Sequence, residues 1–359
     1  MKGQRGIDYS GPSSYARENG AAGLLVLPSK FIREHWGHIR QLFERNQISL
    51  EKPIQTSNST APIGSTFLAS PKLAQALFSG ESSDPLSGTA TKSFDLRPDK
   101  RINLNLALKQ ETVMTQNVAA LWEGNDPVLK NEMVAVGAHY DHVGSKCGLV
   151  SGDVICNGAD DDGSGTTGVL AIAEALAKSS KRPKRSILFV WHAGEEKGLL
   201  GSEYFTRYPT VPLDKVIAQL NIDMIGRSRK ANDSNPKNKV LSGENEIYVI
   251  GSKMMSTELG NLAESVNKSF LNLNYNFKFD DPKDPNRFFF RSDHFHYTSK
   301  GIPIFFWFNG EHEDYHRPDD EPGKIDYQRM EKITKTIFLT MWELADLKSR
   351  PIVDKPLTP

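Results

Sequence analysis

Five short segments of this sequence carry histidine or carboxylate side chains beside apolar runs. They are AHYDH from residue 138, NGADDDGSG from 157, HAGEE from 192, NIDMIG from 221 and EDYHRPDD from 313. Imidazole nitrogen and carboxylate oxygen are the ligands that zinc and similar divalent ions accept, and a catalytic site leaves one position open for water. Several buried carboxylates also need a counter-cation, because an unpaired charge is costly to bury. The order His, Asp, Glu-Glu, Asp, His therefore predicts a hydrolytic site with two metal ions.

The candidate ligands His139, Glu196 and Asp223 each follow an apolar run that is typical of a strand. In an open α/β sheet, functional groups gather beyond the carboxyl ends of the strands, so residues distant in the sequence can meet there. A single histidine after a strand is usually an ordinary polar residue, but several companions in the same position favour ligands. In the first segment, Asp141 and His142 could also bind a metal or support His139.

Three consecutive aspartates, Asp160, Asp161 and Asp162, lead directly into a helix through the letters GSG. One of them can serve as the helix N-cap, where a carboxylate is favoured by the helix dipole. Three adjacent carboxylates exceed what capping requires, and their mutual repulsion predicts a bound cation.

The adjacent pair Glu195 and Glu196 ends the apolar run SILFVWHA and precedes GLLGS, in which glycines permit a tight turn. Two neighbouring carboxylates can divide the work, one binding a metal and the other transferring protons. His316 lies in a polar loop, where Asp314 and Asp320 are available to orient its ring. Among the remaining histidines, we expect His192 and His296 to be structural, His294 to support the site from behind the ligands, and His312 to be a spare candidate.

The composition narrows the class of protein. A chain of 359 residues suggests about two domains. Lys+Arg and Asp+Glu both total 44, so there is no net charge and no basic stripe to favour nucleic acid as a partner. No apolar run is long enough for a membrane span, and the amino terminus lacks the apolar stretch of a signal peptide. Cys147 and Cys156 lie in one Gly-rich loop, and their spacing leaves a disulfide and two free thiols equally open.

The elements that must position these residues follow from the hydrophobic pattern. Strands are expected over 133–138, 186–193, 216–223, 246–251 and 302–308, and helices over 166–179, 257–270 and 326–347. Such alternation predicts an α/β fold with a central, mixed and largely parallel sheet between helices. Nearer the amino terminus, the pattern predicts a helix from residue 14 to Gly20, a strand ending at Pro28, a helix near 71–79 stopped by Gly80, and a strand over 101–110.

Taken together, these motifs resemble the co-catalytic zinc aminopeptidase family, which also includes glutamate carboxypeptidases, glutaminyl cyclases and transferrin-receptor-like proteins. The resemblance runs from about residue 115 to 345. It implies two Zn²⁺ per chain, one held by His139 and Asp223, the other by Glu196 and His316, with Asp161 as the bridge. It further implies that Glu195 is the general base, that Asp141 orients His139, and that the Asp161–Asp162 peptide is cis.

Residues 1–85 resemble a protease-associated domain, through YARENGAAGLLVLPS and the later segment IQTSNSTA. The first strands of such a domain and the peptidase segment that precedes it in relatives are not in this sequence, so we expect an N-terminally truncated chain. Residues 86–114 would be a linker with a connecting strand, and residues 115–350 the zinc peptidase domain. Relatives with this arrangement are exported, which implies an extracellular or periplasmic protein and a Cys147–Cys156 bridge.

The resemblance implies a metal-dependent exopeptidase that acts on peptides, most simply an aminopeptidase in which Glu195 activates a water shared by the two zinc ions. A carboxypeptidase or dipeptidase needs a basic clamp for a terminal carboxylate, for which Arg291 or Arg317 is available. Glutaminyl cyclisation uses a single zinc, and the complete ligand set disfavours both it and a receptor-like module. We expect Asp160 or the Glu195 side to hold a free ammonium, and the aromatic segments 288–290 and 305–308 to form an apolar pocket. The sequence does not indicate an oligomeric state.

Overall fold

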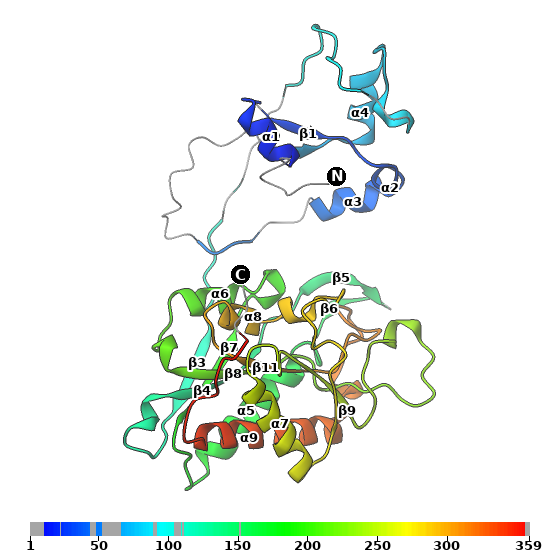
Figure 1. Cartoon of the computed structure of the whole chain (residues 1–359). Helices are drawn as coiled ribbons and strands as arrows, with labels where there is room; N and C mark the ends of the chain where they lie inside the picture. Colours follow the sequence, from blue (N-terminus) through cyan, green and yellow to red (C-terminus); the bar gives the residue numbers. More distant parts are fainter. Residues whose placement is uncertain are drawn as a thin grey trace. The chain divides into compact units, whose positions relative to one another are not determined.

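The computed structural model describes residues 11–21, 23–43, 48–51, 66–88, 92–103, 109, 111–150 and 152–355. Contacts within the chain divide it into two compact units, residues 1–112 and 113–359 (Figure 1). The finer division expected from the sequence, with a linker over 86–114, stays a prediction.

The first unit contains short elements around a pair of parallel strands. Its elements are α1 (Pro12–Glu18), β1 (Leu24–Val26), α2 (Lys30–Glu34), α3 (Trp36–Phe43), β2 (Thr66–Leu68), α4 (Pro71–Phe78) and the 3₁₀ helix η1 (Pro85–Ser87). Strands β1 and β2 pair in parallel. Helix α4 is the helix expected near 71–79, and it begins where the Ser70 hydroxyl accepts a hydrogen bond from the backbone N–H of Leu73. The segment IQTSNSTA and most of the strand expected over 101–110 lie outside the described residues.

The second unit is built on a seven-stranded sheet with the order β10-β9-β11-β8-β4-β7-β3. Its strands are β3 (Val118–Trp122), β4 (Met133–His139), β7 (Ser186–His192), β8 (Val216–Ile222), β9 (Glu246–Ile250), β10 (Asn274–Asn276) and β11 (Ile304–Phe308). Strands β7, β4, β8 and β11 are parallel to one another, whereas β3, β9 and β10 run the other way. The expected α/β fold with a mixed, largely parallel sheet is confirmed.

Helices cover both faces of this sheet (Figure 1). They are α5 (Gly163–Ala177), α6 (Leu200–Arg207), α7 (Thr257–Phe270), α8 (His294–Thr298) and α9 (Tyr327–Asp346), with 3₁₀ helices η2 (Leu129–Asn131), η3 (Glu195–Lys197), η4 (Leu213–Lys215), η5 (Pro236–Asn238), η6 (Phe288–Phe290) and η7 (Pro322–Lys324). One apolar cluster joins α5, α7 and α9 to one side of the sheet, and a second joins α6, α8 and η6 to the other. Central strands β4 and β8 are therefore buried along their whole length.

The Gly-rich segment between the first two metal-binding motifs is a hairpin rather than a loop. Strands β5 (Gly144–Val150) and β6 (Asp153–Cys156) pair antiparallel and stand apart from the main sheet. Cys156 is disulfide-bonded, and the side chain of Cys147, the other cysteine of the sequence, lies outside the described residues. The hairpin was missed because a two-stranded ribbon buries one short face and leaves little periodicity to detect.

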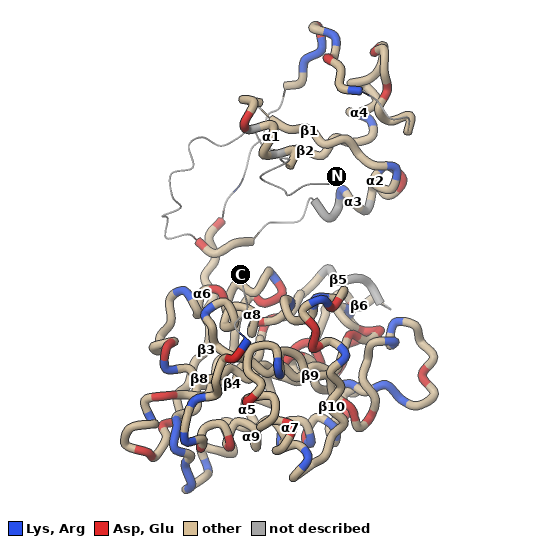
Figure 2. Tube along the Cα trace, in the orientation of Figure 1, with Lys and Arg blue, Asp and Glu red and all other residues tan. Residues whose placement is uncertain are grey.

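Acidic and basic residues are interspersed along the described parts of both units, as expected from the balanced composition (Figure 2). Within the described residues, no helix combines the length and the apolar character needed to cross a membrane.

Candidate metal centre

The carboxyl ends of three parallel strands bring the first candidate ligands together. Strand β4 ends at His139, β8 ends just before Asp223, and β7 ends three residues before Glu195. Because β7, β4 and β8 are adjacent and parallel, these residues lie at the same edge of the sheet. The turn before α5 adds Asp161 and the segment after β11 adds His316.

A first group consists of His139, Asp161 and Asp223, all three buried. The His139 Nε2 atom lies 3.3 Å from Asp161 Oδ1 and 3.7 Å from Asp223 Oδ1. In a tetrahedral zinc site with bonds of about 2.0–2.1 Å, neighbouring ligand atoms lie about 3.3 Å apart. The spacing therefore suits one metal ion held by three protein atoms.

A second group surrounds the other oxygen of the same aspartate. The His316 Nε2 atom lies 3.1 Å from Asp161 Oδ2 and 3.0 Å from Glu196 Oε2. His142 joins this group, with its Nδ1 atom 2.8 Å from Glu196 Oε1 and 3.7 Å from Asp161 Oδ2. Asp161 thus presents one oxygen to each group, which is the position of a bridging ligand.

The donor atoms of both groups fit divalent metal ions. Among the described residues, buried side-chain atoms with no hydrogen-bond partner are concentrated here: His139 Nε2, both ring nitrogens of His142, Asp161 Oδ2, Glu196 Oε1 and His316 Nε2. Buried polar atoms are normally hydrogen-bonded, so such a concentration calls for another partner. Imidazole nitrogen and carboxylate oxygen in one site are typical of zinc.

Glu195 belongs to neither group but lies beside the first. Its Oε2 atom is 3.9 Å from His139 Nε2. Burial raises the pKa of Glu195 well above its usual range, and the carboxylates of Asp223 and Asp293 add to the shift against the opposing effect of His139. A carboxyl group with a raised pKa close to the metal ligands is suited to accept and return a proton.

Asp141 holds the turn that carries both glutamates. Its carboxylate accepts hydrogen bonds from the backbone N–H groups of Glu195 and Glu196, at 3.0 and 3.3 Å. The His139 Nδ1 atom lies 3.0 Å from the backbone oxygen of Asp141 and 3.8 Å from its Oδ1. Asp141 can therefore orient His139 mainly through its backbone carbonyl, while its side chain aligns η3.

Only the middle member of the acidic triplet faces the two groups. Asp162 caps α5 and accepts from the backbone N–H groups of His139 and Met224. Asp160 accepts from Gly226, Ser164 and Asn309 and contacts His312 Nε2 at 3.2 Å. Hydrogen bonds from N–H and O–H donors thus offset most of the repulsion among the three carboxylates. The Asp161–Asp162 peptide is cis, as the resemblance implied.

The two aspartates expected to orient His316 do other work. Asp320 accepts hydrogen bonds from the backbone N–H groups of Asp160 and Asp161, and so fixes the bridging aspartate. Asp314 pairs with Arg227 at 2.9 Å and with Lys324 at 3.0 Å. The His316 ring instead stacks on Tyr315, with ring centroids 3.9 Å apart.

His192 and His294 are structural in their surroundings. His192 contacts the Tyr297 hydroxyl through Nε2 at 3.2 Å, and burial lowers its pKa to about 3. His294 contacts the backbone oxygen of Phe289 at 2.7 Å and packs against Phe306, and burial again lowers the pKa to about 3. Both are buried neutral imidazoles that shape the domain core beneath the site.

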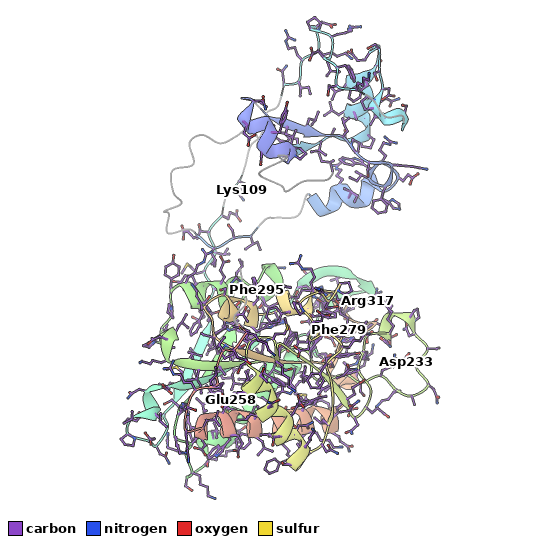
Figure 3. The ribbon with its side chains drawn as sticks, viewed as in Figure 1. Lys109, Asp233, Glu258, Phe279, Phe295 and Arg317 are labelled. Carbon is purple, nitrogen blue, oxygen red and sulfur yellow. The ribbon has the colours of Figure 1, made fainter. Side chains whose placement is uncertain are left out.

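A cavity opens onto the metal groups. It is lined by Asp161, Glu195, Asp223, Met224, Phe288, Arg291, Phe306, Phe308, Glu311 and Tyr315. Four of the lining residues are acidic and three are phenylalanines, and Arg291 pairs with Glu311 at 2.7 Å. Arg317, the other basic candidate, is exposed and is not among the lining residues (Figure 3).

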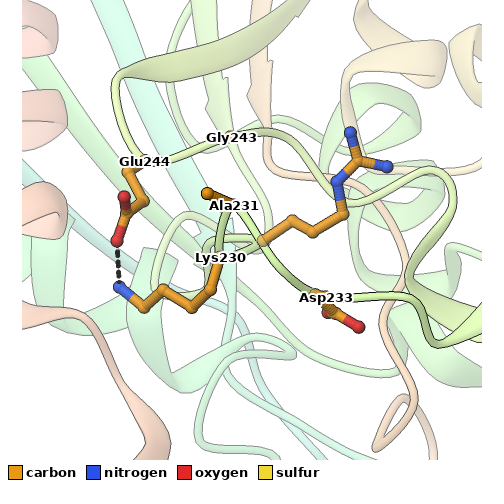
Figure 4. Close-up of a pocket in the computed structure, with 6 residues that line it drawn as sticks. Lys230, Ala231, Asp233, Gly243 and Glu244 are labelled. Atoms are coloured by element: carbon orange, nitrogen blue, oxygen red, sulfur yellow. Dashed lines mark hydrogen bonds and ion pairs between the residues drawn. The ribbon is translucent and has the colours of Figure 1, made fainter.

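A second cavity shares no lining residue with the first. It is polar and lies around Arg229, Lys230 and Asp233, where Lys230 pairs with Glu244 at 2.7 Å (Figure 4). Charged side chains that already pair with each other need no ligand, so this hollow does not compete with the metal centre as a functional site.

Comparisons with known proteins agree with this arrangement. The family model described as "Peptidase family M28" matches residues 117–341. Leucine aminopeptidase 2 of Arthroderma otae is 29% identical over 213 residues, which cover 58% of this chain and 36% of that protein. A probable leucine aminopeptidase 2 of Aspergillus oryzae is 31% identical over 203 residues, covering 56% and 35% respectively. The chain thus spans about a third of the length of these curated relatives.

Solved structures agree on the fold. The crystal structure of LapB from Legionella pneumophila superposes with a TM-score of 0.50 at 21% identity, covering 64% of this chain and 55% of that one. At this identity the likeness concerns the α/β fold alone.

Proposed function

The chain belongs to peptidase family M28, and on this premise we propose that it is an aminopeptidase that removes single residues from the amino termini of peptides. The observation that carries the proposal is the position of Asp161 between the two groups, in the wall of a cavity that Glu195 and Asp223 also line. The names of the relatives, leucine aminopeptidases in two fungi, support the same direction of attack.

We propose that two zinc ions occupy the site. His139, Asp161 and Asp223 would hold the first, and Asp161, Glu196 and His316 the second. When bound, such ions supply Lewis acidity that polarises a carbonyl and makes a water molecule more acidic. The surrounding side chains would transfer the protons and position the reacting groups.

In this mechanism Glu195 moves the protons. Its carboxylate would accept a proton from the attacking water and return it to the departing amine, and its raised pKa places that exchange closer to neutral pH. Asp141 would keep Glu195 in place through the N–H groups of the turn, because it accepts from both glutamates. Burial of the site excludes bulk water and so strengthens these interactions.

The charge of the cavity favours a free amino terminus over a free carboxyl terminus. Asp161, Glu195 and Asp223 line it, and an ammonium group is attracted to such a concentration of carboxylates. Asp160, named as a holder of the ammonium on sequence grounds, is fully buried and engaged by four partners, so it is no longer a candidate. The remaining wall suits an apolar side chain, because Phe288, Phe306 and Phe308 line the same cavity.

A carboxypeptidase remains the second candidate, because Arg291 lines the cavity. Its guanidinium already pairs with Glu311 and lies over the Phe288 ring. To clamp a substrate carboxylate, Arg291 would have to leave this partner, which favours the aminopeptidase.

Hydrolysis of three amino-acid anilides and one blocked peptide tests the proposal. We expect Leu-anilide to be cleaved faster than Lys- or Glu-anilide, and a peptide with a blocked amino terminus and a free carboxyl terminus to resist cleavage. The Glu195→Gln variant is the control for contaminating peptidases. Rapid cleavage of the blocked peptide by the wild type, with the anilides untouched, would reverse the assignment in favour of Arg291 as a carboxylate clamp.

We also propose that the protein works outside the cytoplasm and that residues 1–85 form a protease-associated domain. The disulfide at Cys156 supports the first part, because disulfides persist in oxidising compartments. The parallel pair β1–β2 with flanking helices supports the second. Titration of thiols in the unfolded, unreduced protein tests the location, since two free cysteines would remove its support.

A further inference from the structure

His142 is a histidine for which the five-ligand scheme has no use. It lies three residues after the ligand His139, and its side chain is only 10% exposed. Both of its ring nitrogens are buried, Nε2 has no partner, and Nδ1 lies within ion-pair distance of Glu196 without the alignment of a hydrogen bond. A buried imidazole whose nitrogens make no well-aligned hydrogen bond is costly unless something else satisfies it.

Glycine at position 158 makes room for this ring. Gly158 has a φ of 63°, and a Cβ atom there would lie 2.6 Å from Cγ and 2.8 Å from Cδ2 of His142. No side chain fits between the backbone of residue 158 and the imidazole, so the ring is held against the backbone of the segment that leads to Asp161. The turn is therefore shaped around His142 as well as around the aspartate.

The position of the Nδ1 atom matches a ligand. It lies 2.8 Å from Glu196 Oε1 and 3.7 Å from Asp161 Oδ2, and these values bracket the spacing of about 3.3 Å between ligands of a tetrahedral zinc ion. The contact with Glu196 is short, yet neither atom has a hydrogen-bond partner. The same holds for His316 Nε2, which lies 3.0 Å from the other oxygen of Glu196. The two imidazole nitrogens and the oxygens of Glu196 and Asp161 therefore converge at the spacing that ligands of one ion would have.

We propose that His142, through Nδ1, is a fourth protein ligand of the second metal, beside Asp161, Glu196 and His316. The inference rests on the proposed function only in assuming that metal ions occupy the site. It makes the two positions unequal. The first has three protein ligands and keeps a place open, as catalytic zinc does, whereas the second has the four ligands of a closed site.

Unequal ligand sets predict two steps of metal uptake. The second position, with two imidazoles and two carboxylates, should fill first and release its ion last. Removing His142 should leave two positions of similar ligand count. Without His142, the second position should bind zinc at least about 100-fold more weakly. That is the loss that removing only a hydrogen-bond partner of a ligand can cause.

A simpler role for His142 is to position Glu196 by a hydrogen bond, and one variant separates the two roles. In His142→Asn the side-chain amide can occupy the place of Nδ1 and donate to Glu196, but it is a poor zinc ligand. In His142→Ala both functions are lost. His296→Ala, which removes a histidine from α8 outside both metal groups, is the matched control.

The test is competition for zinc between the full-length protein and a chromophoric chelator, with X-ray absorption spectroscopy of the fully loaded protein. We expect the tight class of sites to weaken about 100-fold or more in both His142 variants, and to be unchanged in His296→Ala. Absorption spectra should indicate three imidazoles for two zinc ions in the wild type and two in His142→Ala.

Recovery of wild-type affinity in His142→Asn, or an unchanged imidazole count in His142→Ala, would overturn the proposal. Neither readout depends on catalysis. A protein that binds zinc in two steps through His142 but cleaves no peptide would refute the aminopeptidase and leave this inference standing.

Discussion

The two oxygens of Asp161 face different groups of ligands, and this one side chain sets the chemistry of the site. Although its burial opposes ionisation, contacts with His139 and His316 hold the pKa of Asp161 well below its usual range. Burial raises the pKa of Glu195, which is a shift in the opposite direction. Opposite pKa shifts of two carboxylates in one cavity fit the roles that we propose, in which Asp161 stays charged and Glu195 exchanges a proton.

Glu195 and Glu196 should therefore respond differently to the same substitution. Glu195→Gln keeps the shape but removes the base, so bound metal should persist while kcat falls by roughly 10²-fold or more. Glu196→Gln removes a ligand, so metal content should fall together with activity. Elemental analysis of both purified variants beside kinetics checks this, and equal loss of metal in the two would refute the division of roles.

His316 predicts how the metal-free protein responds to pH. Burial works to lower its pKa, but Asp161 and Glu196 outweigh burial and raise the pKa to about 9. A histidine with a raised pKa in the folded state stabilises that state fully below its unfolded value of about 6.5, and the contribution is lost as the pH rises through 9. The Tm of chelator-treated protein should therefore fall between about pH 6.5 and 9.

Zinc provides the control for that experiment, because a bound ion replaces the proton on His316. The fall in Tm should be absent from the loaded protein and smaller in metal-free His316→Gln. A Tm of the metal-free wild type that stays level across this range would show that the ion pairs of His316 do not stabilise the fold.

For single residues, the sequence predicted the candidate ligands better than it predicted which side chains contact them. The pattern placed His139, Glu196 and Asp223 after strands and Asp161 before a helix, the family resemblance added His316, and all five lie together. Asp314 and Asp320 were assigned to His316 because they are near it in sequence. Their actual partners, Arg227 and the backbone of the acidic triplet, come from distant parts of the chain. The sequence marked His142 as a residue that could bind a metal or support His139. Its contact with Glu196 could not be predicted, because only the fold brings the two side chains together.

Among the elements, the turn between β7 and α6 controls the two glutamates, and Gly201 sets how closely α6 approaches β7. A Cβ atom at Gly201 would lie 2.6 Å from the backbone nitrogen of Ala193 and 2.5 Å from Asn117 Oδ1. Asn117 ties the same two segments together, accepting from the Ala193 N–H and donating to the Gly201 oxygen. The helix can start where it does only because residue 201 has no side chain.

Gly201→Ala should accordingly destabilise the protein by about 1–3 kcal/mol, the range for a group forced into a packed site, and should also weaken metal binding by moving η3. Gly323→Ala is the matched control, because a Cβ atom there meets nothing within 4 Å. Urea unfolding of the two variants tests the prediction. Equal stability of Gly201→Ala and the wild type would mean that α6 shifts without cost.

The elements of the second unit were largely predictable. Long apolar strands and an amphipathic helix such as α9 leave a clear hydrophobic pattern in the sequence. Every strand expected after residue 115 exists, within a few residues of its expected ends. The order of the strands was not predictable, since β4 pairs with β7 and β8 across long stretches of chain. Short elements such as β10 and the β5–β6 hairpin carry too little pattern to detect.

For the whole molecule, the division into two units is the feature with direct consequences. Both buried apolar clusters of the described residues lie within residues 133–345, and so do all the candidate ligands. A chain cut to residues 113–359 should therefore fold cooperatively and bind zinc with the affinity of the full chain. Circular dichroism with a chelator-competition titration checks this, and an unfolded or weakly binding fragment would show that residues 1–112 contribute to stability.

Asp161, Glu196 and His316, the proposed ligands of the second ion, come from widely separated parts of the second unit, and an ion held by all three would act as a reversible cross-link between them. Such a link shortens the largest loops available to the unfolded chain, as a disulfide does, but it can be withdrawn by a chelator. In a zinc-poor medium the protein would lose this restraint, and with it the peptidase activity that we propose. The rate at which proteases degrade the protein would then depend on the concentration of available metal.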